Sequence, residues 1–347
     1  MRAQVLTGIR QMELRDVAKP VIEKDTDVLL KVEWVGVCGS DVHYYETGKI
    51  GTDTVQYPWI VGHECAATVE QTGGKVTRVK PGDEVVIDPA MSCGKCDQCA
   101  AGRENTCRNL KFLACPGQAE GCLCEYIVMP QDCCFPTGER ITPEQGVVCE
   151  PFSIGVYAVQ CAQIGPDTKA AILGSGPIGL SCLVATRTQG VEKIYMTDKI
   201  KERVDIAKKA GAAWSGNPDL DDIVEAIRRR EPDGMDVVFE CAGEQDTLDE
   251  AIELLRPGGK LMVLGIPRIE RVSFIPDKMR RKEITIINVR RQNKCTQSVI
   301  DLIASGKENV DFMLTHSFDF EQAQEAFDMV AGYRDGVVKA LIRVGAR

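Results

Sequence analysis

Histidine is scarce in this chain, with three residues among 347, and aromatic residues make up only 5% of the sequence. No apolar run reaches the roughly 18 residues that suggest a membrane-spanning helix, so we expect no membrane span. The first residues read directly as a strand and lack the pattern of a signal peptide. The net charge of −9 weighs against nucleic acid and anionic membranes as partners.

Cysteine, in contrast, is abundant, with 16 residues. In a long chain without a secretion signal, cysteines are expected to be metal ligands or buried free thiols rather than disulfides. This favours a reducing, cytoplasmic environment. A chain of 347 residues is also too long to fold around a single compact core, which predicts two domains.

Two of the three histidines lie in the 27-residue segment Cys38–Glu64. The segment opens with Cys38-Gly-Ser-Asp-Val-His43 and closes with Gly62-His63-Glu64. Thiolate, imidazole and carboxylate are the groups that bind zinc in proteins. Alone, Cys38 would read as a buried core thiol and Ser40 as a helix N-cap. Together with the cofactor motif described below, the segment indicates a catalytic zinc site.

A second group of cysteines has the spacing Cys-x2-Cys-x2-Cys-x7-Cys. Four thiolates on a short loop can close a tetrahedron around one ion and leave no open position, which predicts a structural zinc site in a lobe at about residues 91–109. An iron–sulfur cluster is the alternative for such a run. The ligands would be Cys93, Cys96, Cys99 and Cys107.

Residues 1 to about 150 are typical of a small irregular β-barrel. Short strand patterns at 28–35, 65–70 and 84–87 are separated by Gly and Pro turns. From Pro151 the apolar positions follow helical spacing.

A strand pattern, Lys169–Leu173, then runs directly into Gly174-Ser-Gly-Pro-Ile-Gly179 and a helical stretch. The next strand pattern, 194–197, ends on Asp198. Strand, glycine turn, helix, strand and acid in this order form the dinucleotide-binding fingerprint. An acid at this place favours NAD over NADP, although Lys199 and Arg203 keep NADP open as an alternative.

The alternation of strands and helices continues, which predicts a doubly wound parallel sheet. The strand pattern 236–241 leads to Gly243, and the pattern 260–265 ends at Gly265. Ligands bind at the carboxyl ends of such strands. We therefore expect the cofactor to contact Gly174, Gly176, Pro177, Gly179, Asp198, Gly243, Leu264, Gly265 and Ile266. Contacts from Ile178 and Arg203 are implied only by the resemblance given below.

The alternation of strand and helix patterns stops near Asn288. A terminal strand pattern at 338–344 then indicates that the chain returns to the first domain. The expected domains are 1–151, 152–287 and the return segment 288–347. His316 reads as an ordinary loop residue.

In order, these motifs resemble the zinc-dependent medium-chain alcohol dehydrogenases, over essentially the whole chain. Within that superfamily, the stretches Cys38–Gly51 and Glu150–Gly155 and the pair Asp198 and Arg203 are most similar to sorbitol (polyol) dehydrogenases. The resemblance implies an α/β protein: a GroES-like β-barrel catalytic domain plus a Rossmann doubly wound parallel-sheet NAD-binding domain.

The resemblance also implies roles for single residues. Cys38, His63 and Glu64 would bind the catalytic zinc. Glu150 would contact its water or bind the metal itself, whereas Cys149, a ligand position in many alcohol dehydrogenases, is one residue out of register. Ser40 and His43 would relay the substrate proton, and Tyr44, Glu150 and Arg290 would contact substrate.

The expected activity is oxidation of a secondary alcohol of a small-molecule polyol, of the sorbitol or xylitol type, to a ketose with two zinc ions per chain and NAD. Zinc as a Lewis acid eases release of the hydroxyl proton, and the nicotinamide accepts the hydride. L-threonine or a cyclitol is the alternative substrate, and Arg291 stands where an aromatic residue is expected. A non-catalytic NAD-binding relative is the alternative of another class. We also expect a homo-oligomer, a dimer or tetramer, with an edge strand near 261–265 pairing between subunits.

Overall fold

The computed structural model describes residues 1–345, which divide into two compact units. One unit contains Met1–Glu150 and the chain from Thr296 onward, and the other contains Pro151–Cys295. The sequence placed the return at residue 288, but Cys295 Sγ donates to Gln160 Oε1 (3.6 Å) and stays with the second unit. The last two residues of the predicted segment 288–347 lie outside the described residues.

A seven-stranded sheet is the centre of the first unit. Strand β3 (Asp27–Gly36) pairs with β6 (Glu64–Thr72) along one edge, and with β10 (Tyr126–Pro130) and β19 (Lys339–Arg343) along the other. The path β11-β7-β6-β3-β19-β18 is completed by β7 (Glu84–Ile87), β11 (Cys134–Pro136) and β18 (Leu314–Asp319). The pairs are antiparallel except β18–β19. Within residues 1–345 no ladder joins β11 to β18.

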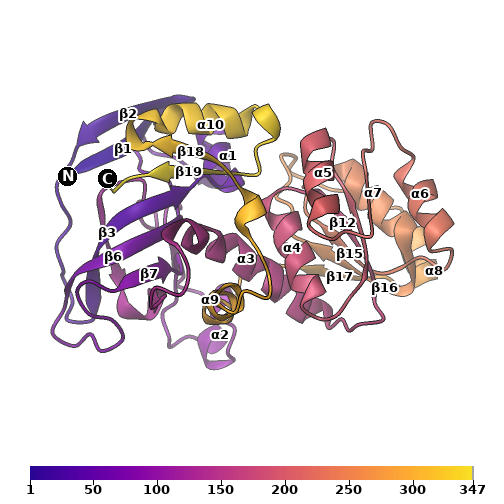
Figure 1. Cartoon of the computed structure of the whole chain (residues 1–347), viewed down its shortest axis with the longest axis horizontal. Coiled ribbons are helices and arrows are strands. Elements are labelled where there is room, and N and C mark those ends of the chain that lie inside the picture. Colours follow the sequence, from indigo (N-terminus) through magenta and orange to yellow (C-terminus); the bar gives the residue numbers. More distant parts are fainter. Residues whose placement is uncertain (346–347) are drawn as a thin grey trace. The chain divides into compact units, whose positions relative to one another are not determined.

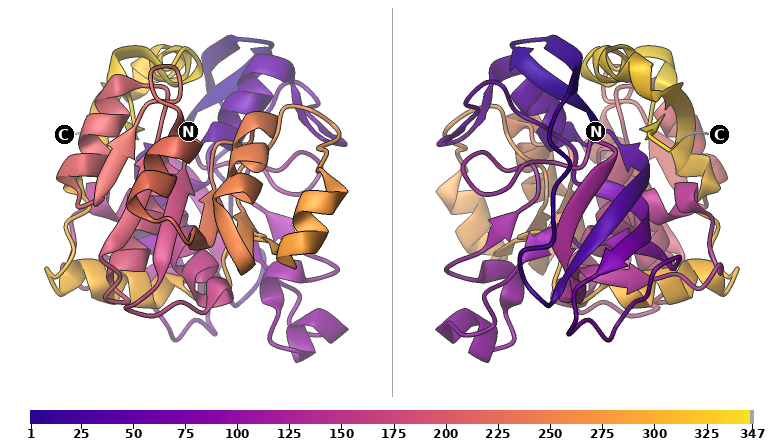
Figure 2. Two further views of the ribbon diagram at one scale, coloured as in Figure 1. Left: turned by 90° about the vertical axis from the view of Figure 1, so that its right-hand side faces the viewer. Right: turned by 90° about the vertical axis from the view of Figure 1, so that its left-hand side faces the viewer.

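The sheet brings the two ends of the chain together. The last strand, β19, pairs with β3, so segments some 300 positions apart share one sheet. In Figure 2 (right) the yellow C-terminal segment lies beside the indigo and purple strands. Helix α10 (Ala323–Ala331) packs on β18, β19, β2 (Gln11–Asp16) and α1 (Gly39–Thr47), as Figure 1 shows. Smaller elements of this unit are β1 (Arg2–Gly8), β4 (Lys49–Ile50), β5 (Asp53–Thr54), β8 (Ala90–Met91), α2 (Asp97–Ala100), β9 (Lys111–Phe112) and α9 (Thr296–Ala304).

Helix α3 (Pro143–Ala162) begins eight residues before the predicted start at Pro151. Its beginning is a reciprocal cap: the Gln145 N–H donates to Thr142 Oγ1 (3.2 Å), and the Thr142 N–H donates to Gln145 Oε1 (3.0 Å). Pro143 takes the first helical position, where its missing N–H costs nothing. Pro151 lies inside the helix and removes only one backbone hydrogen bond there.

The second unit is built on a six-stranded parallel sheet in the order β14-β13-β12-β15-β16-β17. Its strands are β12 (Lys169–Leu173), β13 (Lys193–Thr197), β14 (Trp214–Gly216), β15 (Met235–Glu240), β16 (Leu255–Val263) and β17 (Thr285–Asn288). The central strands are almost entirely buried, as parallel strands covered on both faces are.

Helices connect these strands as right-handed crossovers. They are α4 (Pro177–Arg187), α5 (Lys201–Lys209), α6 (Ile223–Arg230), α7 (Gln245–Leu254) and α8 (Pro276–Lys282). The chain winds outward from β12 to β14, crosses back, and winds outward from β15 to β17. The strand order therefore reverses between β12 and β15, and this reversal defines the predicted doubly wound fold and its ligand-binding edge.

Several local predictions were wrong. The sequence predicts a helix at 247–255 that is closed by Arg256-Pro-Gly-Gly259, but Leu255 and these four residues belong to β16. Because β16 pairs with both β15 and β17, the segment 261–265 does not supply an edge, and β17 does. His316 lies in strand β18, bonded to Thr315 and Asp335, rather than in a loop. In the part of the chain that the structure describes, no helix is long and apolar enough to cross a membrane.

Candidate functional site

Three predicted zinc ligands meet in the first unit. Each offers one donor atom, and the donor atoms of Cys38, His63 and Glu64 lie within 4.8 Å of one another. Cys38 is the N-cap of α1, and Glu64 opens β6 directly after His63. His63 and Glu64 are buried. Sulfur, nitrogen and oxygen donors at such separations suit a zinc ion.

Asp41 orients the imidazole of His63. Asp41 Oδ2 lies 3.1 Å from His63 Nδ1, and its Oδ1 accepts the Gly62 N–H at 3.2 Å. Burial alone would lower the pKa of His63, but the charges of Asp41 and Cys38 outweigh burial and raise it. With Nδ1 facing the Asp41 carboxylate, Nε2 of the neutral ring is the nitrogen that could bind a metal, because a carboxylate behind a histidine ligand fixes its tautomer and orientation. The sequence motif contained Asp41, yet its role was missed.

Glu64 has a partner that the sequence did not reveal. Lys339 Nζ donates to both carboxylate oxygens of Glu64, at 2.8 and 2.6 Å, and to Val37 O at 3.3 Å. Both side chains are about 1% exposed. They come from β6 and β19, on either side of β3, and meet beside Gly36, where a Cβ atom would lie 2.3 Å from Glu64 Oε2. Gly36 thus provides the space for this ion pair.

Glu150 is buried near the same group but is not one of the three mutually close donors among the described residues. Burial raises its pKa to about 7, with the neighbouring charges of His63, Glu64 and Lys339 also acting on it. Cys149 is fully buried, its Sγ donates to Gln145 O (3.6 Å), and burial raises its pKa. Its surroundings are those of a core thiol.

Helix α1 carries the three other predicted residues. Ser40 Oγ donates to Cys38 Sγ at 3.3 Å. Ser40 therefore lies within helix α1, beside the predicted zinc ligands, and does not cap the helix, whose N-cap is Cys38. His43 is half-buried one turn further on. Tyr44 is buried, with its hydroxyl 4.0 Å from Cys115 Sγ, and burial foremost raises its pKa. Their roles in proton relay and substrate contact stay predictions.

The four lobe cysteines converge as predicted, with their sulfur atoms within 4.8 Å of one another. Cys96 Sγ lies 3.5 Å from Cys99 Sγ and 3.8 Å from Cys107 Sγ. A tetrahedral zinc with Zn–S bonds of about 2.3 Å separates its sulfurs by about 3.8 Å. A backbone hydrogen bond from Lys95 is the main cause that lowers the pKa of Cys93 to about 6. The geometry fits a closed, structural ion.

In the second unit, the glycine turn has the shape its motif predicts. Gly174 has a φ of 100°, and a Cβ atom on Gly179 would lie 1.8 Å from Gly174 O. Pro177 is at the first turn of α4, whose N-cap Gly176 offers no side-chain cap. The free helix N-terminus is a suitable place for the negative charge of a pyrophosphate.

Asp198 follows β13 and is bonded to that turn. Its Oδ2 accepts the Ser175 N–H (2.8 Å), and its Oδ1 accepts the Ile200 N–H (2.9 Å). Arg203 is buried, and its Nη1 would lie 3.5 Å from a Cβ atom on Gly176. The sequence missed Ser175, which joins the two predicted cofactor elements.

The remaining predicted cofactor residues follow β15 and β16 at the same edge of the sheet. The loop after β15, which contains Gly243, closely contacts the loop after β16. A Cβ atom on Gly243 would lie 2.7 Å from Ile266 O, and one on Gly265 would lie 2.2 Å from Gly243 N. Leu264 donates its N–H to Glu240 O. Arg290 belongs to the second unit and follows β17. Its contact with substrate stays a prediction.

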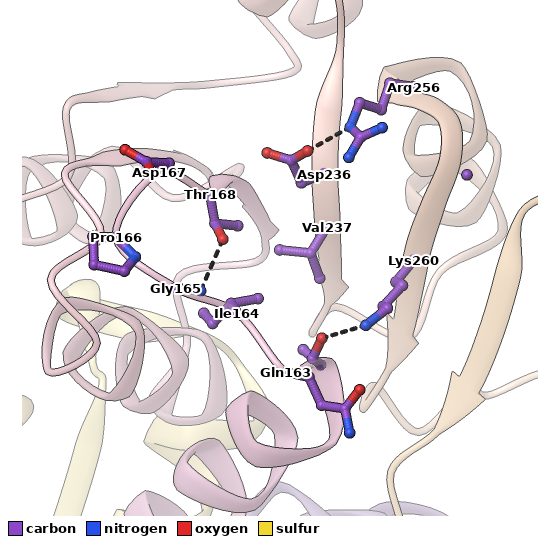
Figure 3. Close-up of a pocket in the computed structure, with 12 residues that line it drawn as sticks. Gln163, Ile164, Gly165, Pro166, Asp167, Thr168, Asp236, Val237, Arg256 and Lys260 are labelled. Atoms are coloured by element: carbon purple, nitrogen blue, oxygen red, sulfur yellow. Dashed lines mark hydrogen bonds and ion pairs between the residues drawn. The ribbon is translucent and has the colours of Figure 1, made fainter.

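A pocket of about 350 Å³ lies at the opposite edge of this sheet (Figure 3). It is lined by the amino ends of β15 and β16 and by the loop before β12. Its polar groups bond one another: Arg256 to Asp236, Lys260 Nζ to Ala162 O, and the Gly165 N–H to Thr168 Oγ1. Parallel sheets bind ligands at the carboxyl ends of their strands, so this pocket is not the cofactor site.

Known proteins share this arrangement. Residues 24–139 match the family model of the alcohol dehydrogenase GroES-like domain, and residues 177–305 match that of the zinc-binding dehydrogenases. A zinc-binding dehydrogenase from Sinorhizobium meliloti 1021, solved with NADP bound, has a TM-score of 0.90 at 30% identity, covering 99% of this chain and 98% of that one.

The chain therefore belongs to the zinc-dependent medium-chain alcohol dehydrogenases, an oxidoreductase family that uses zinc and a nicotinamide dinucleotide. Within it, the chain is similar to polyol dehydrogenases. It is 34% identical to the sorbitol dehydrogenase of Bacillus subtilis (strain 168), covering 99% of this chain and 97% of that protein. It is also 34% identical to the L-idonate 5-dehydrogenase of Vitis vinifera, covering 94% and 90%.

Metal analysis separates the two neighbouring candidates for a ligand. We expect two zinc ions per wild-type chain, one in Cys38→Ser and two in Cys149→Ser, because a serine hydroxyl stays protonated where a thiolate would bind. Elemental analysis of the purified proteins provides the measurement. Loss of an ion from Cys149→Ser, or retention of both in Cys38→Ser, would contradict the assignment.

Removal of the Lys339 charge should destabilise the first unit. Breaking a buried ion pair by removing one partner costs about 3–5 kcal/mol, because the other charge stays buried. Lys339→Met should lose this much in urea unfolding, and much less when introduced into Glu64→Gln, where no carboxylate is left unpaired. Lys75→Met, which breaks an exposed pair with Asp25, is the control and should change little. Equal losses in both backgrounds would mean that the pair is not the cause.

Proposed function

We propose that this protein is an NAD-dependent polyol dehydrogenase that oxidises a secondary alcohol of a sorbitol- or xylitol-type substrate to a ketose. The observation that carries the proposal is the convergence of Cys38, His63 and Glu64 beside the buried Glu150. The oriented fingerprint turn with Asp198 supplies the second requirement, a place for the hydride acceptor.

Zinc, when bound, acts as a Lewis acid that eases loss of the hydroxyl proton, and NAD accepts the hydride. The chain's own residues do the rest. Asp41 holds the ring of His63, and Lys339 holds the carboxylate of Glu64. Ser40, whose hydroxyl contacts Cys38 Sγ, is the first acceptor of the substrate proton, and His43 on the same helix passes it outward. Glu150 serves as the buried group that contacts the metal or its water.

The cofactor is NAD rather than NADP in this proposal. Both oxygens of Asp198 are held by backbone N–H groups, so its charge is fixed at the end of β13, where the adenosine ribose binds. A carboxylate there repels a 2′-phosphate. The NADP in the Sinorhizobium meliloti relative and the nearby Arg203 favour the alternative.

Sorbitol and L-idonate, named in two relatives, are both polyhydroxy compounds, which supports a polyol as substrate. In the proposal, Tyr44 and Arg290 contact its hydroxyls. None of the sixteen cysteines, all within the described residues, forms a disulfide, which is consistent with a protein of the cytoplasm.

We also propose that two copies associate through β17. This strand is the edge of the parallel sheet, and the segment between β16 and α8 exposes the apolar side chains of Ile266, Ile269, Val272 and Ile275. An open strand edge pairs readily with another strand, and a two-fold axis beside β17 would join two sheets into one.

A substrate panel tests the activity. With sorbitol, xylitol, ribitol, galactitol, inositol, L-idonate and L-threonine, each with NAD and NADP, we expect the fastest cofactor reduction with a neutral open-chain polyol and NAD. Absorbance at the wavelength of the reduced nicotinamide is the readout. Faster turnover of threonine than of every polyol would refute the substrate class, and no turnover with any alcohol would favour the non-catalytic alternative.

Sedimentation tests the association. Wild-type protein should sediment as a dimer or a larger even-numbered assembly, and Ile269→Lys with Val272→Lys should shift it toward monomer, because charge enters the contact. Leu220→Lys changes an even more exposed apolar residue elsewhere on this unit and should have no effect. A wild-type monomer, or an unchanged assembly in the double variant, would contradict the proposed contact.

A further inference from the structure

Glu240, the last residue of β15, has a buried carboxyl group that the proposed reaction does not use. It is 1% exposed. Its Oε1 accepts three hydrogen bonds, from the Ala242 N–H (2.8 Å), the Gly243 N–H (2.7 Å) and the Thr247 hydroxyl (2.8 Å). Its Oε2 has no hydrogen-bond partner in the described part of the chain. Burial raises the pKa of Glu240, although these hydrogen bonds act to lower it.

The main chain of the same residue holds the next loop. Glu240 O accepts the N–H groups of Leu264 and Gly265, at 2.9 and 3.0 Å. Its Oε2 faces Gly265, where a Cβ atom would lie 2.6 Å from this oxygen. One residue therefore ties the loop after β15 to the loop after β16.

The glycine turn of the fingerprint rests against the same place. The Cys241 N–H donates to Leu173 O at 2.8 Å. A Cβ atom on Gly174 would lie 3.1 Å from Ala242 N. The three loops after β12, β15 and β16 are therefore in direct contact around Glu240, so displacement of the Ala242–Gly243 turn would move its neighbours.

Glu240 also fills a small anion-binding turn. The Ala242 and Gly243 N–H groups, three and two residues before helix α7 begins at Gln245, both point to Glu240 Oε1. Successive backbone N–H groups in a turn can hold an anion. Here a carboxyl group of the chain itself takes that place.

The strand order defines which half of the cofactor these loops meet. Asp198, which follows β13, would recognise the adenosine ribose, and the start of α4 would hold the phosphates. A dinucleotide bound in this way would cross the sheet at the reversal between β12 and β15. The loops after β15 and β16 would then meet its nicotinamide half.

We propose that Glu240 is a positioning residue for the nicotinamide half of the cofactor: through Oε1 and its main-chain oxygen it sets the loops after β15 and β16 against which that half binds. The proposal rests on the proposed use of NAD. It assigns Glu240 no contact with the reacting atoms. Its effect is to keep the Ala242–Gly243 turn in the one conformation that leaves room for the ring.

Two ligands that differ only by the nicotinamide end test this role. NADH contains both halves, and ADP-ribose lacks the nicotinamide ring. In Glu240→Ala, the dissociation constant of NADH should rise tenfold or more, while that of ADP-ribose changes less than twofold. Glu240→Gln keeps the acceptor oxygen and should restore NADH binding to within threefold of wild type. Fluorescence titration for NADH and calorimetry for ADP-ribose, with the full-length protein, give the values.

Two further variants distinguish positioning from general stability. Thr247→Val removes one of the three hydrogen bonds at a half-buried position and should weaken NADH alone, by two- to fivefold, even if Glu240→Ala does not fold. Glu231→Gln alters another buried glutamate of this unit, which pairs with Lys169 and Tyr195 far from the carboxyl edge. It should lower the melting temperature without separating the two ligands.

The outcomes are separable. If the wild-type protein binds neither NADH nor ADP-ribose, the proposed use of NAD fails. If wild type binds both, and Glu240→Ala or Thr247→Val weakens both ligands equally, or weakens neither, the role of Glu240 is overturned. A selective loss of NADH affinity, restored in Glu240→Gln, supports it.

Discussion

The ion pair between Lys339 and Glu64 is the constraint around which the first unit is arranged. Taking two charges out of water costs several kcal/mol each, so the pair is tolerable only when its geometry is close. Strand β3 separates the two residues, and Gly36 on it leaves the space in which they meet. The last strand of the chain is therefore part of the metal site. Without β19, the carboxylates of Glu64 and Glu150 and the thiol of Cys38 would lie together without a fixed positive charge.

Carboxylates that accept backbone N–H groups recur in both units, in the first turn of α1 and directly after or at the end of strands β13 and β15. Asp41 accepts from Gly62 and contacts His63, Asp198 accepts from Ser175 and Ile200, and Glu240 accepts from Ala242 and Gly243. A carboxylate has several lone pairs and can hold two N–H groups at once. Each of these residues holds a loop that carries a residue predicted to bind metal or cofactor. The hydrogen bonds therefore fix loops that would otherwise be more mobile than the elements they connect.

Sequence reasoning succeeded where the signal is local. The strand Lys169–Leu173 begins and ends where it was predicted, because a short apolar run that leads into the glycine turn of the fingerprint indicates a buried strand. The lobe cysteines meet as their spacing within one short loop predicted. It failed where competing local signals existed. Arg256-Pro-Gly-Gly259 looks like a turn, yet parallel pairing with β15 draws it into β16. Helices α6 and α8, which span only eight and seven residues, were not predicted.

The sequence by itself determined the family of this protein and predicted its chemistry: the side chains that would bind metal and the turn that would hold a dinucleotide. These follow from short motifs whose spacing fixes their geometry within a turn or two of chain. Only the tertiary structure decided what surrounds those motifs. Lys339 is 275 positions from Glu64, and the loops after β15 and β16 meet through strand order. Contacts of this kind depend on which strands become neighbours, and no local spacing encodes that.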